Sequence, residues 1–331
     1  MQNQLPKNVY DQISANRWRT GVLLFMFPLI ILGLTYLGIF LALFFSGGEE
    51  YGNVGLFEVA NMMMRTVGFW VIIAVFLWSF ISYFAGSKMI LGYAGAKPIK
   101  KRDAPEFYNA VENMSIVAGL PKNPKAYIIE DNSLNAFATG NSPENSKIAV
   151  TRGLLEELDK AELEAVVAHE MGHVVNRDIR VMLIMITLVG AVQIIGEVML
   201  RSGLMRGSRN SKGNNILPII GLLFVTVGVL VGVLTKFAVS REREYLADAT
   251  GAYFTSNPVA LASALEKIAQ NSYSEKLQAK PVIGSICLSD PTIPPVSVDG
   301  KKSSVKKPGF WKKIWSTHPP IEDRIDLLRR Y

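Results

Sequence analysis

The sequence contains little cysteine and little histidine, and these scarcities narrow the chemistry that the protein can use. Its single cysteine, Cys287, excludes an internal disulfide and a zinc site built from several thiolates. Only three histidines occur among 331 residues, so imidazole chemistry is confined to a few positions. Lys and Arg outnumber Asp and Glu by 35 to 28, but basic residues gather in loops beside apolar runs, and the sequence carries no nucleic-acid-binding signature.

Charge is missing from long stretches of the chain. Residues 20–45 and 66–87 contain no charged side chain, and each run exceeds the roughly 20 helical residues that cross a hydrocarbon core. Residues 216–235 form another uncharged run, whereas residues 181–200 include Glu197 near the end, where an ionised group reaches headgroup water cheaply. Because 49% of the residues are hydrophobic and they gather in such blocks, the sequence predicts four hydrophobic helices in two hairpins.

The charges around these runs predict how the chain is oriented in a membrane. The first run is too long for the apolar region of a cleavable signal peptide, so we expect it to stay as an anchor. Positive charges flank both ends of the first hairpin, which places both ends in the cytoplasm by the positive-inside rule. The loop of the second hairpin disagrees, so either the first hairpin fixes the topology or the second enters the bilayer without crossing it. The charges of that loop are Arg201, Arg206, Arg209 and Lys212.

The segment AVVAHEMGHVVNRD contains an HExxH motif formed by His169, Glu170 and His173. Four helical residues return the chain nearly to the same face, so both imidazoles can reach one zinc ion at about 2.0–2.1 Å. Glu170 lies one step further round the helix, where it can act as a base on metal-held water. A capping-box pattern at Asp159 and Glu162, followed by apolar residues near helical spacing, predicts a helix and argues against the alternative of two solvated surface histidines.

The zinc site needs a third ligand, because a catalytic zinc usually has three protein ligands and one open position. We select Glu244, in the REREYLAD segment after the fourth apolar run, over Glu242 and the remaining histidine, His318. Asp248 lies four residues after Glu244 on the same helical face and can orient a zinc-bound imidazole. The alternative is that this segment is only a charged helix beside a membrane.

Further helices and a small sheet are expected around these motifs. Residues 104–120 have the pattern of an amphipathic helix with Asp103 as candidate cap, whereas residues 271–307 show little periodicity and predict a flexible insertion or loop. Three short β-type runs, AYIIE, NAFAT and KIAVT, precede the zinc motif. Later helices are expected at 240–251, 258–270 and 319–331.

The predicted fold class is a mainly α membrane protein with a cytoplasmic α+β zincin-like catalytic domain that carries a small sheet. We expect this domain to be built in two parts, with a hydrophobic hairpin between them. The predicted parts are a cytoplasmic tail (1–19), a first transmembrane hairpin (20–87), the first catalytic part (88–178), a second hydrophobic hairpin (179–239) and the second catalytic part (240–331), with a flexible insertion near 271–316.

HEMGH, EYLAD, NAFATG and STHPPIEDR, with two hydrophobic hairpins in this order, resemble the HtpX-type membrane zinc metallopeptidases, relatives of the CAAX prenyl proteases. The resemblance covers most of the chain. It implies one Zn²⁺ per chain held by His169, His173 and Glu244, with Glu170 as catalytic base. It also implies a gluzincin-type endopeptidase of the bacterial plasma (inner) membrane, multi-pass, with its active site facing the cytoplasm and misfolded or damaged membrane proteins as substrates.

Two other segments are candidates for substrate contact. Residues 135–138 (Asn135, Ala136, Phe137 and Ala138) are expected to form an edge strand that aligns an extended peptide, the alternative being an ordinary buried strand. His318 and Arg324 are candidate donors to the oxyanion that forms at the scissile carbonyl. For His318 the alternative is helix-start chemistry, because Thr317 precedes two prolines.

Two other functions use the same residues. A prenyl-protein endoprotease would apply the same zinc chemistry to lipidated tails, but two hairpins provide too few spans to enclose a lipid chamber. A membrane scaffold with a non-catalytic zinc site would not need the open ligand position or Glu170. The sequence therefore favours a peptidase whose partners are protein or peptide substrates and the lipid bilayer.

Overall fold

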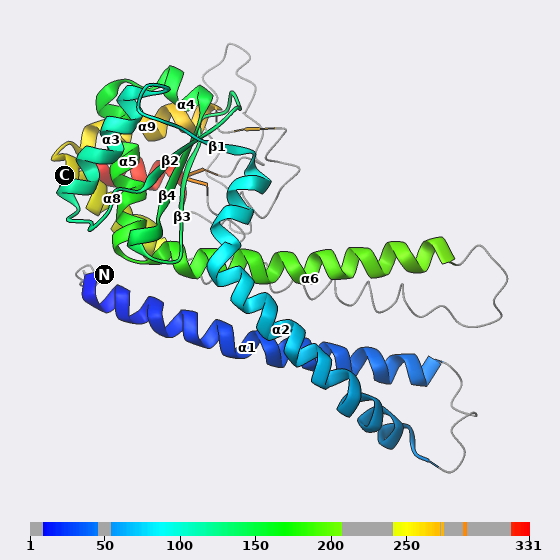
Figure 1. Ribbon diagram of the computed structural model, residues 1–331. Helices are drawn as coiled ribbons and strands as arrows, with labels where there is room; N and C mark the ends of the chain where they lie inside the picture. Colours follow the sequence, from blue (N-terminus) through cyan, green and yellow to red (C-terminus); the bar gives the residue numbers. More distant parts are fainter. Residues whose placement is uncertain (1–8, 46–53, 207–240, 272, 275–286, 290–318) are drawn as a thin grey trace. The chain divides into compact units, whose positions relative to one another are not determined.

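The computed structural model describes residues 9–45, 54–206, 241–271, 273–274, 287–289 and 319–331 (Figure 1). The chain folds into two compact units. One unit comprises Met1–Trp18, Ala85–Leu183 and Thr235–Tyr331, and the other comprises Arg19–Phe84 and Ile184–Leu234. Each unit is therefore built from segments that are distant in the sequence.

Long helices make up the described part of the second unit. They are α1 (Val9–Phe45), α2 (Leu56–Ala94) and α6 (Asp178–Arg206), parts of which belong to the first unit. The first three apolar runs are thus helical, as predicted, and the fourth, 216–235, lies outside the described residues. Within this unit the three helices share one apolar cluster, whose buried members are Phe27, Ile31, Leu34, Val75, Ile184, Leu188 and Val192.

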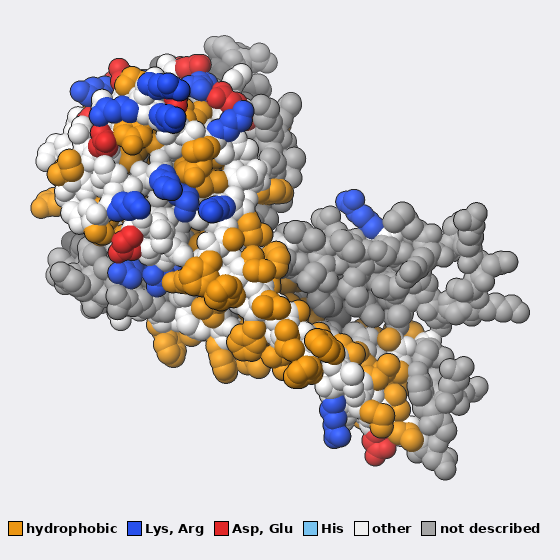
Figure 2. All heavy atoms as spheres, in the orientation of Figure 1, with side chains coloured by type: hydrophobic (Ala, Val, Ile, Leu, Met, Phe, Trp, Pro, Cys, Tyr) orange, Lys and Arg blue, Asp and Glu red, His pale blue; other side chains and the backbone are white. Residues whose placement is uncertain are grey.

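The outer surfaces of these helices are apolar as well. Among the described residues, Trp18–Phe45 and Leu56–Ala94 are long and apolar enough to cross a membrane. Large side chains on α2 stay exposed, including Trp70 at 66% and Phe80 at 64%, and Figure 2 shows such side chains crowded along this helix. Exposed apolar surface of this extent is suited to hydrocarbon rather than to water.

The first unit contains a small mixed sheet in the order β1-β2-β4-β3. The strands β2 and β4 are parallel, and the other two pairings are antiparallel. The three predicted strands are confirmed, whereas β1 was missed because its three residues, Ala, Lys and Pro, carry no β pattern. The bounds are β1 Ala96–Pro98, β2 Lys125–Ile129, β3 Ala136–Thr139 and β4 Lys147–Thr151.

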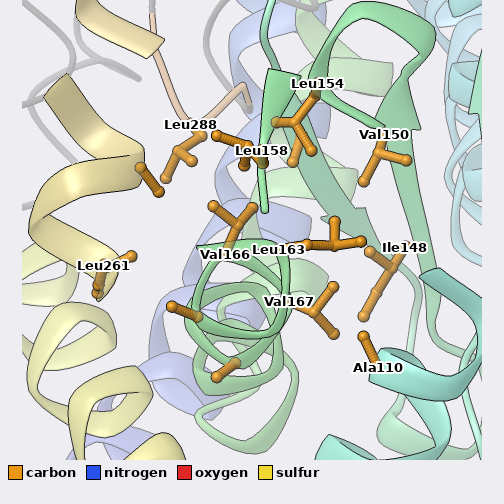
Figure 3. Packing of buried hydrophobic residues seen from close by; sticks show 14 of the residues in the cluster. Ala110, Ile148, Val150, Leu154, Leu158, Leu163, Val166, Val167, Leu261 and Leu288 are labelled. Carbon is orange, nitrogen blue, oxygen red and sulfur yellow. The ribbon is translucent and has the colours of Figure 1, made fainter. Parts of the chain in front are cut away.

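Helix α5 (Lys160–Val175), which carries the HExxH motif, lies at the centre of this unit and contacts α3, α8, α9 and β3. Its predicted capping box is confirmed: Asp159 accepts from the Glu162 backbone N–H, and Glu162 accepts from the Asp159 backbone N–H. Apolar side chains surround the helix, with Val166 and Val167 turned toward different neighbours (Figure 3). A helix apolar on most of its faces requires such burial.

Helices α3, α8 and α9 pack against α5, α13 packs against α8 and α9, and α4 packs beside β4. They include the predicted helices at 104–120, 240–251, 258–270 and 319–331, which are all confirmed with shorter or shifted ends. The candidate cap Asp103 is wrong, because Ala104 is the N-cap residue of α3 and Asp103 accepts from the Lys100 backbone N–H at 2.8 Å instead. The bounds are α3 Pro105–Val117, η2 Pro143–Asn145, α4 Arg152–Glu157, α8 Arg241–Thr255, α9 Pro258–Asn271 and α13 Ile321–Leu328.

Candidate metal centre

Helices α5 and α8 approach each other closely because small residues line their contact. A Cβ atom on Gly172 would lie 3.3 Å from Cα of Ala247, and one on Gly251 would lie 3.0 Å from the backbone nitrogen of His169. This crossing sets Glu244, one turn before Ala247, beside the HExxH motif. The close packing of two helix backbones therefore brings together residues that lie in distant parts of the sequence.

The side chains of His169, His173 and Glu244 converge at this crossing. One ligand atom from each lies within 4.8 Å of the other two, and all three residues are buried. Nε2 of His173 is 3.7 Å from Oε1 of Glu244. The structure therefore brings together the three residues expected to be ligands, and they form a group that can hold a metal ion.

Each imidazole has a carboxylate behind it. Nδ1 of His169 lies 2.9 Å from Oδ1 of Asp248, and Nδ1 of His173 lies 3.1 Å from Oδ2 of Asp178. A carboxylate at Nδ1 accepts the ring N–H and leaves the Nε2 lone pair available. Among the described residues, neither ring nitrogen of His169 has a partner in hydrogen-bond geometry, although both atoms are buried. Nδ1 faces the Asp248 carboxylate at 2.9 Å, which leaves Nε2 for a metal ion. A buried imidazole nitrogen whose lone pair accepts no hydrogen bond is suited to bind a metal ion.

Arg324, on α13, binds the carboxylate behind His169. Its Nε and Nη2 atoms donate to Oδ2 and Oδ1 of Asp248 at 2.8 and 2.7 Å, and Nη1 lies 3.6 Å from Oε2 of Glu244. Burial alone would raise the pKa of Asp248, but the guanidinium outweighs it and holds this pKa below its usual value. Arg324 thus lies at the site, while His318 and Thr317 lie outside the described residues and α13 has Pro320 as its N-cap residue.

The formal charge of the cluster favours a divalent cation. In the described part of the chain, the buried groups at this site are the carboxylates of Glu170, Asp178, Glu244 and Asp248 and the guanidinium groups of Arg243 and Arg324. With all carboxylates ionised and both imidazoles neutral, as metal ligands require, four acids and two bases leave a formal net charge of minus two. Buried charge is costly unless it is balanced, and one divalent cation would balance it.

The acids also act on the second imidazole of the motif. Burial alone would lower the pKa of His173, but the hydrogen bond to Asp178 and the charges of Glu244, Asp178 and Glu170 raise it to about 9. The same negative field that favours a proton on this ring favours a metal cation in its place. His169, by contrast, has its pKa lowered by burial.

Glu170 lies beside these groups and is itself buried. Burial raises its pKa to about 7, and the charge of Glu244 adds to this increase, whereas His173, the backbone of Ala138 and Arg324 oppose it. A carboxyl group whose pKa is close to neutral can both accept and return a proton at neutral pH. This is the property that a general base in hydrolysis needs.

Strand β3 is an edge strand of the sheet, as expected for residues 135–138. All four residues of β3 are nevertheless buried. The Thr151 N–H donates to the Asn135 carbonyl, so Ala136 and Ala138 direct their backbone groups away from β4. A short segment takes part of that outer edge: Leu288 N–H donates to the Ala136 carbonyl at 2.9 Å. The Asn135 amide also donates to the Ser289 carbonyl at 2.8 Å. No pattern in the sequence indicates this pairing.

A helical HExxH motif joined by a glutamate from a later helix is the arrangement of a metallopeptidase centre. The comparison with protein families agrees: residues 101–331 match the family described as Peptidase family M48. The chain belongs to this family.

Relatives match nearly the whole chain. A protein named "Protease HtpX homolog" from Bacteroides fragilis (strain YCH46) is 35% identical over 328 residues, which cover 98% of each chain. One with the same name from Tropheryma whipplei (strain Twist) is 43% identical over 250 residues, covering 75% of this chain and 80% of the relative. The protein is therefore a membrane metallopeptidase, and the apolar helices α1 and α2 agree with that class.

Among solved structures, the crystal structure of S. mikatae Ste24p aligns with 81% of this chain and 65% of its own, at 18% identity and a TM-score of 0.41.

Proposed function

We propose that the protein is a zinc-dependent endopeptidase of the bacterial plasma membrane that hydrolyses peptide bonds in misfolded or damaged membrane proteins. The observation that carries the proposal is the buried group of His169, His173 and Glu244, whose ligand atoms lie within 4.8 Å of one another. Two imidazoles and one carboxylate suit zinc. The names of the relatives support a protease, and the apolar helices support a membrane as its environment.

His169, His173 and Glu244 would hold the zinc ion, which would supply Lewis acidity for the deprotonation of water and the polarisation of the scissile carbonyl. Glu170 then accepts the proton at its carboxylate and passes it to the leaving amine. Its buried carboxylate follows His169 directly in the motif, beside the proposed ligands, which suits both steps. Arg324, whose Nη1 lies 3.6 Å from Glu244 and donates to the Leu288 carbonyl at 3.4 Å, is one proposed donor to the oxyanion, and His318 is the second.

The substrate is proposed to lie along the outer edge of β3 as an extended strand. Backbone pairing of this kind accepts many sequences, which suits an enzyme that acts on damaged proteins of no single sequence. Asn135 and Ala136 already bind Ser289 and Leu288, so the part of the edge proposed to receive substrate begins at Ala138. Phe137 contributes its backbone to β4 rather than to this edge.

The decisive experiment is a casein cleavage assay on the detergent-purified protein, with zinc removed by a chelator and then restored. Cleavage should disappear on chelation and return with zinc. Glu170→Gln should keep the metal and lose about 10²- to 10⁴-fold in rate. Glu164→Gln, the same substitution at a partly buried position on α5, is the control and should keep its activity. Bound zinc without cleavage by the wild type would favour a scaffold.

The catalytic unit is proposed to face the cytoplasm, with the second hydrophobic hairpin returning the chain to the same side. The positive charges that flank the first hairpin support this orientation. Reporter fusions at Gly207 test whether the second hairpin crosses. An external signal there supports a full crossing, and a cytoplasmic signal excludes one.

A further inference from the structure

We propose that Asp178 and Arg243 are positioning residues for His173, a role that rests on the proposed zinc site. Oδ2 of Asp178 lies 3.1 Å from Nδ1 of His173, and Oδ1 of the same carboxylate lies 3.6 Å from Nη1 of Arg243. Asp178 and Arg243 are both 1% exposed. The carboxylate therefore connects the imidazole to a buried cation.

The turn that delivers Asp178 is strained. Helix α5 ends at Val175, Asn176 keeps a helical conformation, and Arg177 adopts a φ of 60°, in the left-handed region that non-glycine residues rarely enter. Asp178 then opens α6 and lies beside a side chain five residues earlier. A non-glycine residue in this conformation costs backbone free energy. Its presence therefore indicates that the surrounding structure requires this direction of the turn.

The two imidazoles of the motif are supported in parallel. His169 has Asp248 behind it, which accepts two hydrogen bonds from Arg324, and His173 has Asp178 behind it, which lies 3.6 Å from Arg243. A carboxylate at Nδ1 fixes the ring orientation and makes Nε2 a better electron donor to a metal. Helix α8 delivers Arg243 immediately before Glu244, so one helical turn supplies both a metal ligand and the cation that supports another ligand.

The competing explanation is structural, because an acid in the first turn of α6 also stabilises that helix through its dipole. Zinc affinity separates the two roles. Asp178→Asn should weaken zinc binding by about 10- to 100-fold in competition with a chromophoric chelator. It should also change the visible absorption of the cobalt-substituted protein. Asp131→Asn, which alters another buried carboxylate bonded to Ser133 and Ser274, should leave both measurements unchanged.

Two further variants keep the test decisive. Should Asp178→Asn fail to fold, Arg243→Gln removes the cation while the carboxylate stays, and we expect a smaller but measurable loss of zinc affinity. Glu244→Gln, measured in parallel, tests the zinc site itself. If Glu244→Gln loses zinc while Asp178→Asn binds it as tightly as the wild type, only the positioning role is overturned. If Glu244→Gln also keeps zinc, the third ligand of the proposed site is overturned as well, and that role passes to Glu242 or His318.

Discussion

A Cβ atom on Gly251 would lie 3.0 Å from the backbone nitrogen of His169 and 3.1 Å from its Cα. Gly251→Ala must therefore push α8 away from α5, and Glu244 moves with it. Overpacking of this kind costs about 1–3 kcal/mol of stability, and zinc affinity should fall because the proposed third ligand is displaced. Thermal unfolding and zinc competition measure the two effects.

The matched control is Gly92→Ala on α2, where an added Cβ meets nothing within 4 Å among the described atoms. That substitution should leave zinc affinity unchanged and gain about 0.5–1 kcal/mol in helix stability. Wild-type zinc affinity in Gly251→Ala would show that the close approach of the helices does not set the position of Glu244.

Arg324→Gln should destabilise the protein strongly. It leaves the buried carboxylate of Asp248 without the guanidinium that binds it through two hydrogen bonds, and breaking a buried pair from one side costs about 3–5 kcal/mol. Denaturant unfolding of Arg324→Gln, Asp248→Asn and the double variant measures the coupling free energy between these two residues. The double variant should lose less than the two single variants together; strictly additive losses would mean that the pair acts as two independent residues.

The ion pair of Glu162 makes stability depend on pH. Burial alone would raise the pKa of Glu162, but Lys267 and Ser263, each at 2.7 Å, outweigh it and hold this pKa below its usual value. The ionised Glu162 therefore contributes fully to the free energy of unfolding above about pH 4.5. This contribution is lost as the pH falls through the lowered pKa of the folded state.

Glu162→Gln should cost about 1–3 kcal/mol near pH 7, and its difference from the wild type should shrink steadily below about pH 4.5. Unfolding free energies measured between pH 7 and 3 test this, with Glu164→Gln as the control on the same helix. A difference that stays constant over this range would exclude an ionised Glu162 as the stabilising group.

Ala138→Pro should impair substrate binding, because the proline ring occupies the outer edge of β3, where the Ala138 carbonyl is proposed to pair with substrate, without removing a hydrogen bond to β4. The backbone of Ala138 also favours the ionised form of Glu170, so KM and kcat are measured separately. Loss of strand pairing raises KM. Ala138→Gly keeps the N–H and should retain the wild-type KM, and equal KM values in the proline variant would argue against an edge-bound substrate.

Local patterns in the sequence were sufficient for several parts of the fold. The capping box at Asp159 and Glu162 fixes the start of α5, and the spacing of His169 and His173 follows from helix geometry alone. The shared helical face of Glu244 and Asp248 follows from the same geometry. The choice of Glu244 as third ligand also required the expectation that the second hairpin returns the chain to the same side, and the resemblance to a known family. In the structure, the contact between α5 and α8 brings Glu244 to the two histidines.

Contacts that depend on irregular backbone were missed. Asp178 reaches His173 only because Arg177 is left-handed, and no local pattern signals that conformation in an arginine. The sequence offers one clue to the role of Asp178, which is that an acidic residue follows shortly after the HExxH motif. The bond from Leu288 to Ala136 joins residues far apart in the sequence and involves only backbone atoms, so side-chain patterns could not reveal it.

The catalytic unit is interrupted in the sequence by Ile184–Leu234, which belong to the other unit. A ribosome therefore completes both histidines of the motif well before it adds Glu244, and the intervening residues must be translated first. The nascent chain holds an unfinished centre throughout this interval. The three residues of the candidate metal centre can therefore meet only after translation has passed residue 244.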